Sequence, residues 1–373
     1  MKRTAIIMAG GSGERFWPLS RKRKPKQLLP LASEKPMIRE SIERISSIIH
    51  PEDIYIITGH LLIESIRRAL PMLPPENVIA EPYKRNTAPC LALGAAFIAE
   101  KYSGEYKPSE ISIAVLTADQ SIRPKEAFEK TVDETLFYVE NNPVLGTIGI
   151  LPSRPETGYG YIEVNEPFDY EKDKVQIKEV KQFREKPDIK TAKEFLESGN
   201  FLWNSGMFFW RLDVFTEAMK KALPEVGNKI NEMSKCYTKW TETPLPEPLQ
   251  TVSPVFDKFP DVSIDYGLME KADKVVVAKA LFTWDDIGSW DSLERVKEPD
   301  NEGNITFGET ALVNVTNSVI ANYSSGKKII TTGIKLDNMV IVVTDDAVMV
   351  CPKDEVQNVK KAVKIVKDKG DWV

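Results

Sequence analysis

The first part of the chain alternates short apolar runs with helix-like stretches, and this alternation limits the possible folds more than any other feature of the sequence. The runs contain few polar residues, so each is expected to be a strand buried on both faces. Such strands, separated by helices, indicate an α/β fold with a largely parallel sheet covered on both sides. The predicted strands lie at 4–9, 53–58, 77–80 and 111–117, and the predicted helices lie at 36–49, 60–70, 87–102 and 124–141.

The middle of the chain is richer in strand-like runs. These occupy 144–211 and are followed by helical patterns at 212–222 and 224–236. We interpret the proline-rich segment 241–254 as a surface excursion rather than a domain linker. A last helix of this part reaches about residue 297.

After the polar segment EPDNEGN, the pattern changes again. Short β runs recur at intervals of roughly ten residues, which favours a small all-β module and is compatible with a β-solenoid. The module closes with the helical segment DEVQNVKKAVKIVKD. The predicted domains are therefore 1–297 and 298–373.

Composition excludes several classes of function. The 373 residues carry a net charge of −5, so we expect no nucleic acid held by a broad basic field. Three widely spaced cysteines and two histidines argue against a disulfide framework, a cysteine zinc site and a Ser-His-Asp triad. The first apolar run is too short for a signal peptide, and no run approaches a membrane span. We therefore expect a cytoplasmic protein without a membrane partner.

The segment GGSGERF, residues 10–16, directly follows the first predicted strand, where parallel sheets bind ligands. Glycines there let backbone N–H groups approach an anion, but the spacing matches neither the Walker nor the dinucleotide pattern. The glycines alone favour a tight turn and a phosphate cradle equally. Arg15 and Lys26 add positive charge, although a run such as RKRKPKQ is ordinarily a solvated basic turn.

Seven further motifs accompany this loop in a fixed order. They are EPYKRNTAPC (81–90), LTADQ (116–120), TGYGYIE (157–163), FREKP (183–187), WNSGMF (203–208), SIDYGLMEK (263–271) and WDDIGSW (284–290). Together they resemble the sugar-nucleotide pyrophosphorylases, and most closely the members that form GDP-mannose. One departure is Gln120, where the pattern has His after the Asp; it puts in doubt only the surroundings of a metal at Asp119.

The resemblance implies a fold, a reaction and partners. The fold is a Rossmann-like nucleotidyltransferase domain with a mostly parallel mixed sheet, followed by a small left-handed β-helix-like domain. The reaction is transfer of GMP from GTP to mannose 1-phosphate with release of pyrophosphate, assisted by Mg²⁺. Because two anions must meet, the barrier consists largely of charge repulsion and positioning. The family's C-terminal extension further implies a homodimer.

The resemblance also implies site residues by matching positions. Those facing the triphosphate are Gly10, Gly11, Ser12, Gly13 and Arg15, with Lys26 at the α-phosphate and the departing pyrophosphate. Asp119 and Asp286 are the implied Mg²⁺ ligands, although a strand-end Asp is ordinarily a turn residue and Asp285 competes with Asp286.

The implied base and sugar pockets use the remaining motifs. Glu81 is our candidate for base selection, because a carboxylate can accept both N1–H and the exocyclic amine of guanine. The base pocket is completed by Asn86, Thr87 and Ala88, of which Asn86 or Thr87 can equally be a helix cap. The implied sugar-phosphate residues are Gly160, Glu185, Lys186, Asn204 and Asp265.

Three alternatives stay open at this point. A related nucleotidyltransferase would use glucose 1-phosphate or another nucleoside triphosphate, and sequence alone does not quantify that selectivity. A non-catalytic sensor of sugar nucleotides would be expected to lack at least one of Arg15, Lys26, Asp119 and Asp286, all of which are present. A nicotinamide dehydrogenase is disfavoured by the glycine spacing and by the absence of an acidic residue at the end of the second strand.

Overall fold

The computed structural model describes every residue except 169–173, 238–246, 327, 371 and 373. The protein packs as two compact units. The larger unit comprises Met1–Gly10, Ser41–Thr117 and Ile122–Trp284, and the smaller unit comprises Gly11–Glu40, Ala118–Ser121 and Asp285–Val373. The segment after the first strand therefore belongs to the same unit as the C-terminal residues.

The larger unit contains a nine-stranded sheet in the order β3-β2-β1-β4-β9-β6-β10-β8-β7. Its strands are β1 (Lys2–Met8), β2 (Ile54–Gly59), β3 (Val78–Glu81), β4 (Ile111–Thr117), β6 (Leu145–Ile150), β7 (Tyr161–Val164), β8 (Ile177–Arg184), β9 (Phe201–Arg211) and β10 (Val275–Lys279). The four apolar runs of the N-terminal part form β1 to β4, which pair in parallel. Met8 lies opposite Thr117, so the segments that follow β1 and β4 start from adjacent points of one sheet edge.

The strand-rich segment completes this sheet with a different pairing. β9 runs antiparallel between β4 and β6, and β7 and β8 are also antiparallel to their neighbours. β10 pairs in parallel with β6. The sheet is therefore mixed, with its parallel part centred on β1. A short two-stranded sheet of β5 (Ser121–Arg123) and β11 (Thr283–Asp285) accompanies it.

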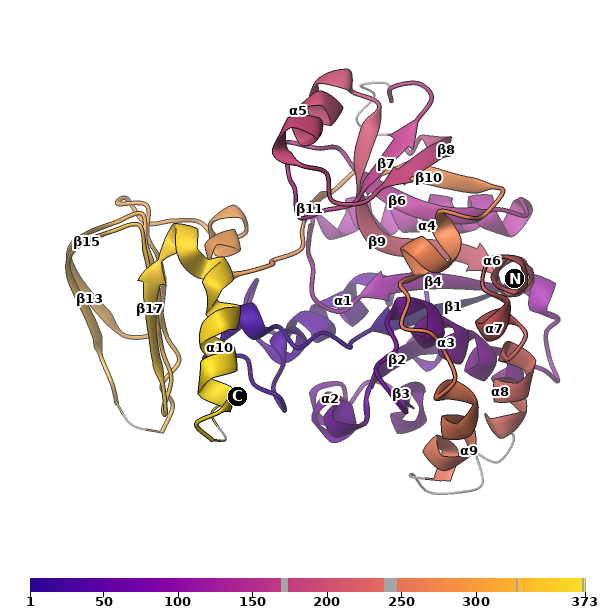
Figure 1. Cartoon of the computed structure of the whole chain (residues 1–373), viewed down its shortest axis with the longest axis horizontal. Coiled ribbons are helices and arrows are strands. Elements are labelled where there is room, and N and C mark those ends of the chain that lie inside the picture. The colour runs from indigo at the N-terminus through magenta and orange to yellow at the C-terminus, as the bar shows by residue number, and fades with distance from the viewer. Residues whose placement is uncertain (169–173, 238–246, 327, 371, 373) are drawn as a thin grey trace. The chain divides into compact units, whose positions relative to one another are not determined.

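Helices pack on the large sheet or on one another (Figure 1). They are α1 (Met37–Ile45), α2 (Ile63–Ala69), α3 (Thr87–Lys101), α4 (Lys125–Asn141), α5 (Ile189–Ser198), α6 (Leu212–Ala222), α7 (Pro224–Gly227), α8 (Ile230–Tyr237) and α9 (Glu247–Phe256). α3 packs on β1, β2 and β3, and most of its residues are buried. A Cβ at Gly94 would lie 2.6 Å from Ile57 Cδ1, so this glycine permits the close approach of helix and sheet.

The helices differ from the sequence expectations in three places. The pattern at 224–236 was expected to form one helix and instead forms α7, which ends at Gly227, and α8. α5 was not expected, although Asp188 caps it by accepting from Thr191 N (2.8 Å) and Gly199 ends it with φ +73°. Of the expected excursion 241–254, residues 241–246 lie outside the described residues, and the rest belongs to α9.

The C-terminal part of the smaller unit has the stacked β architecture that the recurring runs predict. β12 (Ile305–Phe307), β14 (Val319–Asn322) and β16 (Met339–Val343) pair in parallel, and β17 (Val348–Pro352) adds to β16 in antiparallel orientation. β13 (Thr310–Thr316) and β15 (Thr331–Asp337) form a second parallel pair. The chain then forms the 3-10 helix η9 (Lys353–Asn358) and α10 (Val359–Lys367), which Figure 1 shows beside β17. This is a β-helix-like stack closed by a helix.

Strand β16 separates two apolar clusters, because successive side chains of a strand point to opposite faces. Val340 and Val342 belong to a cluster that includes residues of α10, whereas Ile341 and Val343 belong to a second cluster with Ile320. All five side chains are at most 9% exposed. The β stack is thus packed on both sides of this strand.

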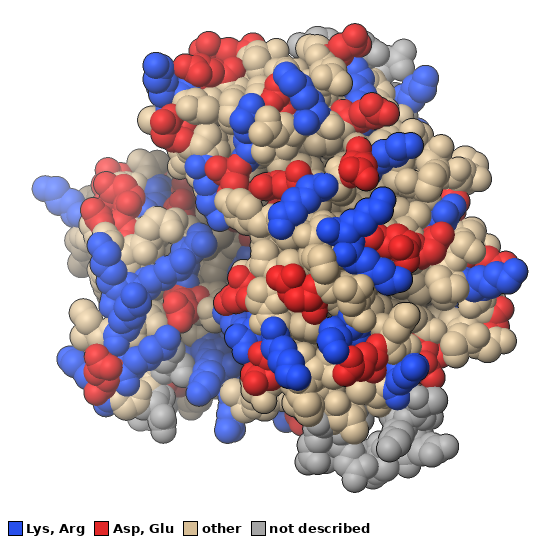
Figure 2. All heavy atoms as spheres, turned by 45° about the vertical axis from the view of Figure 1, so that its right-hand side comes forward, with Lys and Arg blue, Asp and Glu red and all other residues tan. Residues whose placement is uncertain are grey.

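The charged residues are mixed in sign over the face that Figure 2 shows, where Lys and Arg side chains lie among Asp and Glu side chains. Among the described residues, no helix has both the length and the apolar character that crossing a bilayer requires.

Candidate active site

The glycine loop follows β1 and turns at Gly13. Gly13 has φ +61°, and a Cβ there would lie 2.4 Å from Lys26 Cβ. Its carbonyl accepts hydrogen bonds from Phe16 N (2.8 Å) and from Ser20 Oγ (2.7 Å). Both the backbone conformation and the close approach to Lys26 therefore require glycine at this position. At Gly11, by contrast, no atom lies within 4 Å of the place a Cβ would occupy.

Lys26 connects three separate segments of the smaller unit. Its side chain lies in the short 3-10 helix η2 (Lys26–Leu28), directly after Pro25, and the residue is only 6% exposed. The Nζ atom donates to Asp119 Oδ2 (2.9 Å) and to the main-chain oxygen of Asp286 (2.6 Å). A buried ammonium is stable only when such partners replace its water. The structure thus brings together Lys26 and the two aspartates that the motifs single out.

Gly288 lies close to the side chains of both Arg15 and Asp286. A Cβ on this glycine would lie 3.0 Å from Arg15 Nη1 and 3.1 Å from Asp286 Oδ2. Any larger residue would displace one of these two groups. The sequence reasoning did not single out Gly288, although its place in WDDIGSW was a usable signal.

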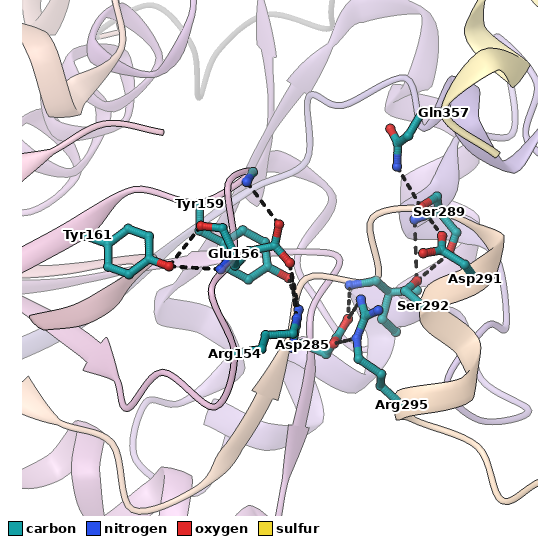
Figure 3. A network of polar contacts seen from close by, with 12 residues as sticks. Arg154, Glu156, Tyr159, Tyr161, Asp285, Ser289, Asp291, Ser292, Arg295 and Gln357 are labelled. Atoms are coloured by element: carbon teal, nitrogen blue, oxygen red, sulfur yellow. Dashed lines mark hydrogen bonds and ion pairs between the residues drawn. The ribbon is translucent and has the colours of Figure 1, made fainter. Parts of the chain in front are cut away.

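Asp285 has a structural role. Arg295 donates to its carboxylate through Nε (2.5 Å) and Nη2 (3.2 Å), and Ile287 N donates to Asp285 Oδ1 (2.8 Å). Figure 3 shows Arg295 directed at this carboxylate. Ile287 has φ +42°, an unfavourable conformation for a β-branched residue that the surrounding contacts must maintain. Asp285 therefore fixes the turn that presents Asp286.

The carboxylates around Lys26 have the chemistry of a magnesium site. Asp119 and Asp286 supply hard oxygen atoms, and Mg²⁺ in phosphate-transfer sites ordinarily takes one or two carboxylates together with phosphate oxygens and water. Among the described residues, no group of three or more His, Cys, Asp and Glu side chains is placed to hold a metal ion. Phosphate oxygens and water would have to complete the coordination of an Mg²⁺ held by these two carboxylates.

Glu81 is a buried acid at the end of β3. The residue is 8% exposed, and a Cβ on Gly10 would lie 3.9 Å from Glu81 Oε2. Burial raises the pKa of Glu81 to about 7, while a hydrogen bond with Cys90 and the positive charge of Lys84 act in the opposite direction. Cys90, on α3, was not singled out from the sequence. The Glu81 carboxyl group therefore changes its charge near neutral pH.

The N-terminus of α3 is fixed by its own loop. Asn86 is the N-cap residue, with φ 65°, and its Oδ1 accepts from Thr87 N (3.0 Å). Thr87 Oγ1 accepts from Ile264 N (2.7 Å), and Ala88 N donates to Val262 O (3.2 Å). The capping interpretation is confirmed for Asn86, and the polar groups of Thr87 and Ala88 serve the packing of this loop.

The residues assigned to the sugar phosphate gather elsewhere in the larger unit. Asn204 N donates to Gly160 O (2.8 Å), and Asn204 Nδ2 donates to Asp265 Oδ1 (2.7 Å). A Cβ on Gly160 would lie 2.9 Å from Glu185 Oε2, so Glu185 borders the same point. Lys186 forms an ion pair with Glu185 (2.9 Å). The structure thus brings together all five residues of this group.

Two of these residues have shifted pKa values. Burial raises the pKa of Asp265, the charge of Glu185 acts in the same direction, and the Asn204 hydrogen bond opposes the shift. The hydrogen bond with Glu185 raises the pKa of Lys186, which keeps its ammonium charged. Asp265 also begins a π-helix, Asp265–Met269, an element that is frequent at functional sites.

An aromatic group in the larger unit surrounds Tyr159. Tyr159 packs edge-on against Trp203 and Trp284, with ring centroids 5.3 and 5.2 Å away. The guanidinium carbon of Arg154 lies 5.0 Å from the centroid of Trp203, and Arg154 pairs with Glu156 (3.1 Å; Figure 3). Trp203 and Trp284 belong to the motifs WNSGMF and WDDIGSW, whereas Arg154 was not singled out. Its position just before the TGYGYIE motif was the available signal.

Comparison with known proteins agrees with this geometry. Residues 4–303 match the family described as Nucleotidyl transferase, and residues 308–366 match the MannoseP isomerase/GMP-like beta-helix domain. The mannose-1-phosphate guanylyltransferase of Escherichia coli (strain K12) is 35% identical over 368 residues, covering 98% of this chain and 73% of that protein. The alginate biosynthesis protein AlgA of Pseudomonas fluorescens is 35% identical over 369 residues, with 98% and 72% covered.

A solved structure gives the same result for the fold. It is described as a mannose-1-phosphate geranyltransferase from Thermus thermophilus and superposes with a TM-score of 0.83 at 30% identity. The match covers 98% of this chain and 100% of that one. The family model matches most of the chain, and relatives that are 35% identical align with 98% of it. The chain belongs to the nucleotidyl transferase family.

Proposed function

We propose that the protein is a mannose-1-phosphate guanylyltransferase. It transfers GMP from GTP to mannose 1-phosphate and releases pyrophosphate. The observation that carries the proposal is the position of Lys26, whose ammonium donates to Asp119 Oδ2 and to the main-chain oxygen of Asp286. Lys26 lies against the glycine loop at Gly13, a position that requires glycine. The names of relatives that are 35–36% identical and are described as mannose-1-phosphate guanylyltransferases, one of them as a putative one, support the choice of substrates.

In the proposed reaction, a phosphate oxygen of mannose 1-phosphate attacks the α-phosphorus of GTP. The new oxygen–phosphorus bond forms as the bond from the α-phosphorus to the bridging oxygen breaks, and pyrophosphate leaves with that electron pair. Arg15 and Lys26 offset the repulsion between the two anions and stabilise the charge that develops on the leaving group. The backbone of Gly10, Gly11, Ser12 and Gly13 receives the triphosphate.

Asp119 and Asp286 would hold Mg²⁺ in this proposal. When bound, the ion neutralises charge on the phosphate oxygens and helps to orient the triphosphate. Lys26 holds the two aspartate-bearing segments together through Asp119 Oδ2 and the main-chain oxygen of Asp286. The contact to Asp286 is made by its main-chain oxygen, so Lys26 positions the segment that carries this aspartate.

Selection of the base is assigned to Glu81, with Asn86, Thr87 and Ala88 shaping the pocket. The ionised Glu81 carboxyl group can accept two hydrogen bonds from the N1–H and the exocyclic amine of guanine, whereas its protonated form loses one acceptor. Asn204, Glu185, Gly160 and Asp265 are assigned to the sugar hydroxyls. Lys186 is assigned to the sugar phosphate, where the raised pKa of its ammonium keeps it cationic.

The remaining parts of the proposal concern organisation. We assign catalysis to residues 1–297 and the β-helix-like extension to 298–373, with a homodimer as the working form. Exposed apolar side chains on the β stack, namely Val313, Ile334 and Val350, support association of two copies. We also propose that the enzyme acts in the cytoplasm and uses neither a nucleic acid nor a membrane as partner, in line with its acidic net charge.

Pyrophosphate release tests the proposal directly. Purified protein with Mg²⁺ is expected to release pyrophosphate with GTP and mannose 1-phosphate, and to use other nucleoside triphosphates or glucose 1-phosphate at least about tenfold less efficiently. Efficient turnover with another pair would keep the mechanism and overturn the specificity. No turnover with any pair would contradict the proposal and favour a sensor.

The pKa of Glu81 predicts how the apparent KM for GTP depends on pH. Between about pH 6 and about pH 8 the KM should fall several-fold as the carboxyl group ionises. Glu81→Gln should have a higher KM and lose this component, because its amide does not titrate. Initial rates at several pH values measure both variants, and the KM for mannose 1-phosphate serves as the internal control.

The same shift has a consequence for stability. Because the pKa of Glu81 is higher in the folded protein than in the unfolded chain, its neutral form stabilises the fold at low pH, and this contribution disappears as pH rises through about 7. Glu81→Gln should therefore gain stability over the wild type as pH increases.

For the kinetic prediction, identical pH profiles for the KM for GTP of the wild type and Glu81→Gln would contradict the assignment of Glu81 to the base.

A further inference from the structure

The apolar side chains that follow the glycine loop are buried in the core of the C-terminal β stack. Phe16 is fully buried and Trp17 is 8% exposed. The cluster that contains them comprises, besides other residues, Leu19, Leu29 and Leu31 of the same segment, Val319, Ala321, Val340, Val342 and Met349 of the stack, and Val359 and Val363 of α10. The cationic segment, Gly11–Glu40 with its basic run RKRKPKQ, is thus packed with the C-terminal residues within one compact unit.

Helix α10 makes the most direct of these contacts. It packs against η1 (Glu14–Phe16), the 3-10 turn that carries Arg15. Lys367 Nζ, in the last turn of α10, pairs with Glu14 Oε1 (2.9 Å). Beyond the helix, the main-chain oxygen of Trp372 accepts a hydrogen bond from Trp17 Nε1 (2.9 Å). Both sides of Arg15 in the sequence are therefore tied to the C-terminal segment.

The preceding 3-10 helix contacts the second functional segment. Gln357 Nε2, in η9, donates to Ser289 Oγ (3.2 Å), three residues after Asp286 (Figure 3). Trp290, the next residue, packs edge-on against Phe16 with ring centroids 5.1 Å apart and donates from Nε1 to Trp17 O (3.3 Å). The C-terminal segment thus supports both the loop with Arg15 and the turn with Asp286.

We propose that η9 and α10, residues 353–367, act as a brace that positions Arg15 and Asp286 for the reaction. The inference rests on the proposed function, because it assumes that these two residues bind the triphosphate and its metal. A glycine-rich loop has high conformational entropy, so charged groups on it need support from elsewhere to be held in place before the substrate arrives. The residues of the brace are positioning residues and do not contact the substrate.

Adjacent clusters of the β stack provide a matched test. Val363→Ala removes two methyl groups from the cluster that contains Phe16 and Trp17, whereas Val343→Ala removes the same groups from the cluster on the other side of β16. We expect Val363→Ala to raise the KM for GTP by about tenfold and to lower kcat, with the KM for mannose 1-phosphate changed by less than about twofold. Val343→Ala should keep the wild-type kcat and the wild-type KM values for GTP and mannose 1-phosphate, even if its Tm falls as much as that of Val363→Ala.

A second pair of variants avoids the core altogether. Lys367→Glu places a like charge beside Glu14, whereas Lys364→Glu makes the same charge change on an exposed position of α10. Lys367→Glu should raise the KM for GTP about threefold, in keeping with the small effect of exposed ion pairs, and Lys364→Glu should not. Should Val363→Ala fail to fold, this pair decides the question.

Hydrogen exchange separates the brace from the reaction. In the unliganded protein, Val363→Ala should accelerate amide exchange in residues 11–24 at least about fivefold relative to Val343→Ala. Equal exchange and equal kinetics in the two variants would overturn the brace. If the wild type proves inactive with every substrate pair, the proposed function fails, yet the exchange comparison still tests whether the C-terminal segment holds this loop.

Discussion

Lys26→Met should lower kcat by about three orders of magnitude while leaving the protein folded. In the wild type, the ammonium of Lys26 donates to Asp119 Oδ2 and to the main-chain oxygen of Asp286. The aliphatic stem packs separately, against Gly13. Methionine keeps most of that stem. The Asp119 side chain is 37% exposed, so water can replace the lost partner and no buried charge is left unpaired.

The matched control is Lys24→Met. Lys24 is an exposed residue of the same basic run, and its removal changes the net charge of the segment equally. Its kcat should stay within about twofold of the wild type, because long-range attraction from one exposed charge is largely screened. Single-turnover rates and circular dichroism of both variants provide the measurement. A Lys26→Met protein that keeps more than about a tenth of the wild-type kcat would contradict the role of Lys26 at the α-phosphate.

Part of the fold follows from local sequence. ISIAVLT contains no charged residue, glycine or proline that would favour another structure, and β4 occupies the same range, 111–117, that this run predicts. The unexpected α5 had local signals as well, in the cap Asp188 and the terminal Gly199. In that case the strand-rich surroundings obscured an amphipathic helix. Strands with strong, uniform apolar patterns are therefore predictable to within one or two residues, whereas short helices within β-rich segments are easily missed.

The packing of the cationic segment could not be predicted in the same way. Trp17 donates to Trp372, and its neighbours share a core with α10, although the two segments lie at opposite ends of the sequence. No local pattern near Phe16 or Trp17 indicates which strands will bury them. The sequence therefore suggests a boundary near residue 297, whereas the contacts group Gly11–Glu40 with the C-terminal residues.

In the candidate site, too, some features follow from local motifs and others only from the folded chain. The motifs indicate Lys26, Asp119 and Asp286, and the structure brings them together. The raised pKa of Glu81 results from its burial, against the opposing hydrogen bond with Cys90, and neither the burial nor this contact can be seen in the order of residues in EPYKRNTAPC. Residue identity and order can thus suggest the participants, but burial and partner choice require the folded chain.

Substitution by asparagine should mainly reduce activity at one of the two neighbouring aspartates of WDDIGSW and mainly reduce stability at the other. Asp286→Asn should lower kcat by about three orders of magnitude at saturating Mg²⁺ and change the Tm little, because an amide is a poor ligand for a hard cation. Asp285→Asn should instead reduce the free energy of unfolding by about 1–3 kcal/mol, since it weakens the contacts with Arg295 Nε and Nη2. The Arg295 side chain is 35% exposed, which keeps this loss below that of a fully buried pair.

Kinetics and thermal unfolding of both variants, measured over a range of Mg²⁺ concentrations, distinguish the two roles. Asp286→Asn should also raise the Mg²⁺ concentration needed for half-maximal rate, whereas Asp285→Asn should not once the folded fraction is taken into account. Asparagine keeps an Oδ1 that can accept from Ile287 N, so the turn in which Ile287 holds a φ of +42° should persist in Asp285→Asn. If Asp285→Asn lost activity as completely as Asp286→Asn while remaining fully folded, the metal would have to be assigned to both carboxylates.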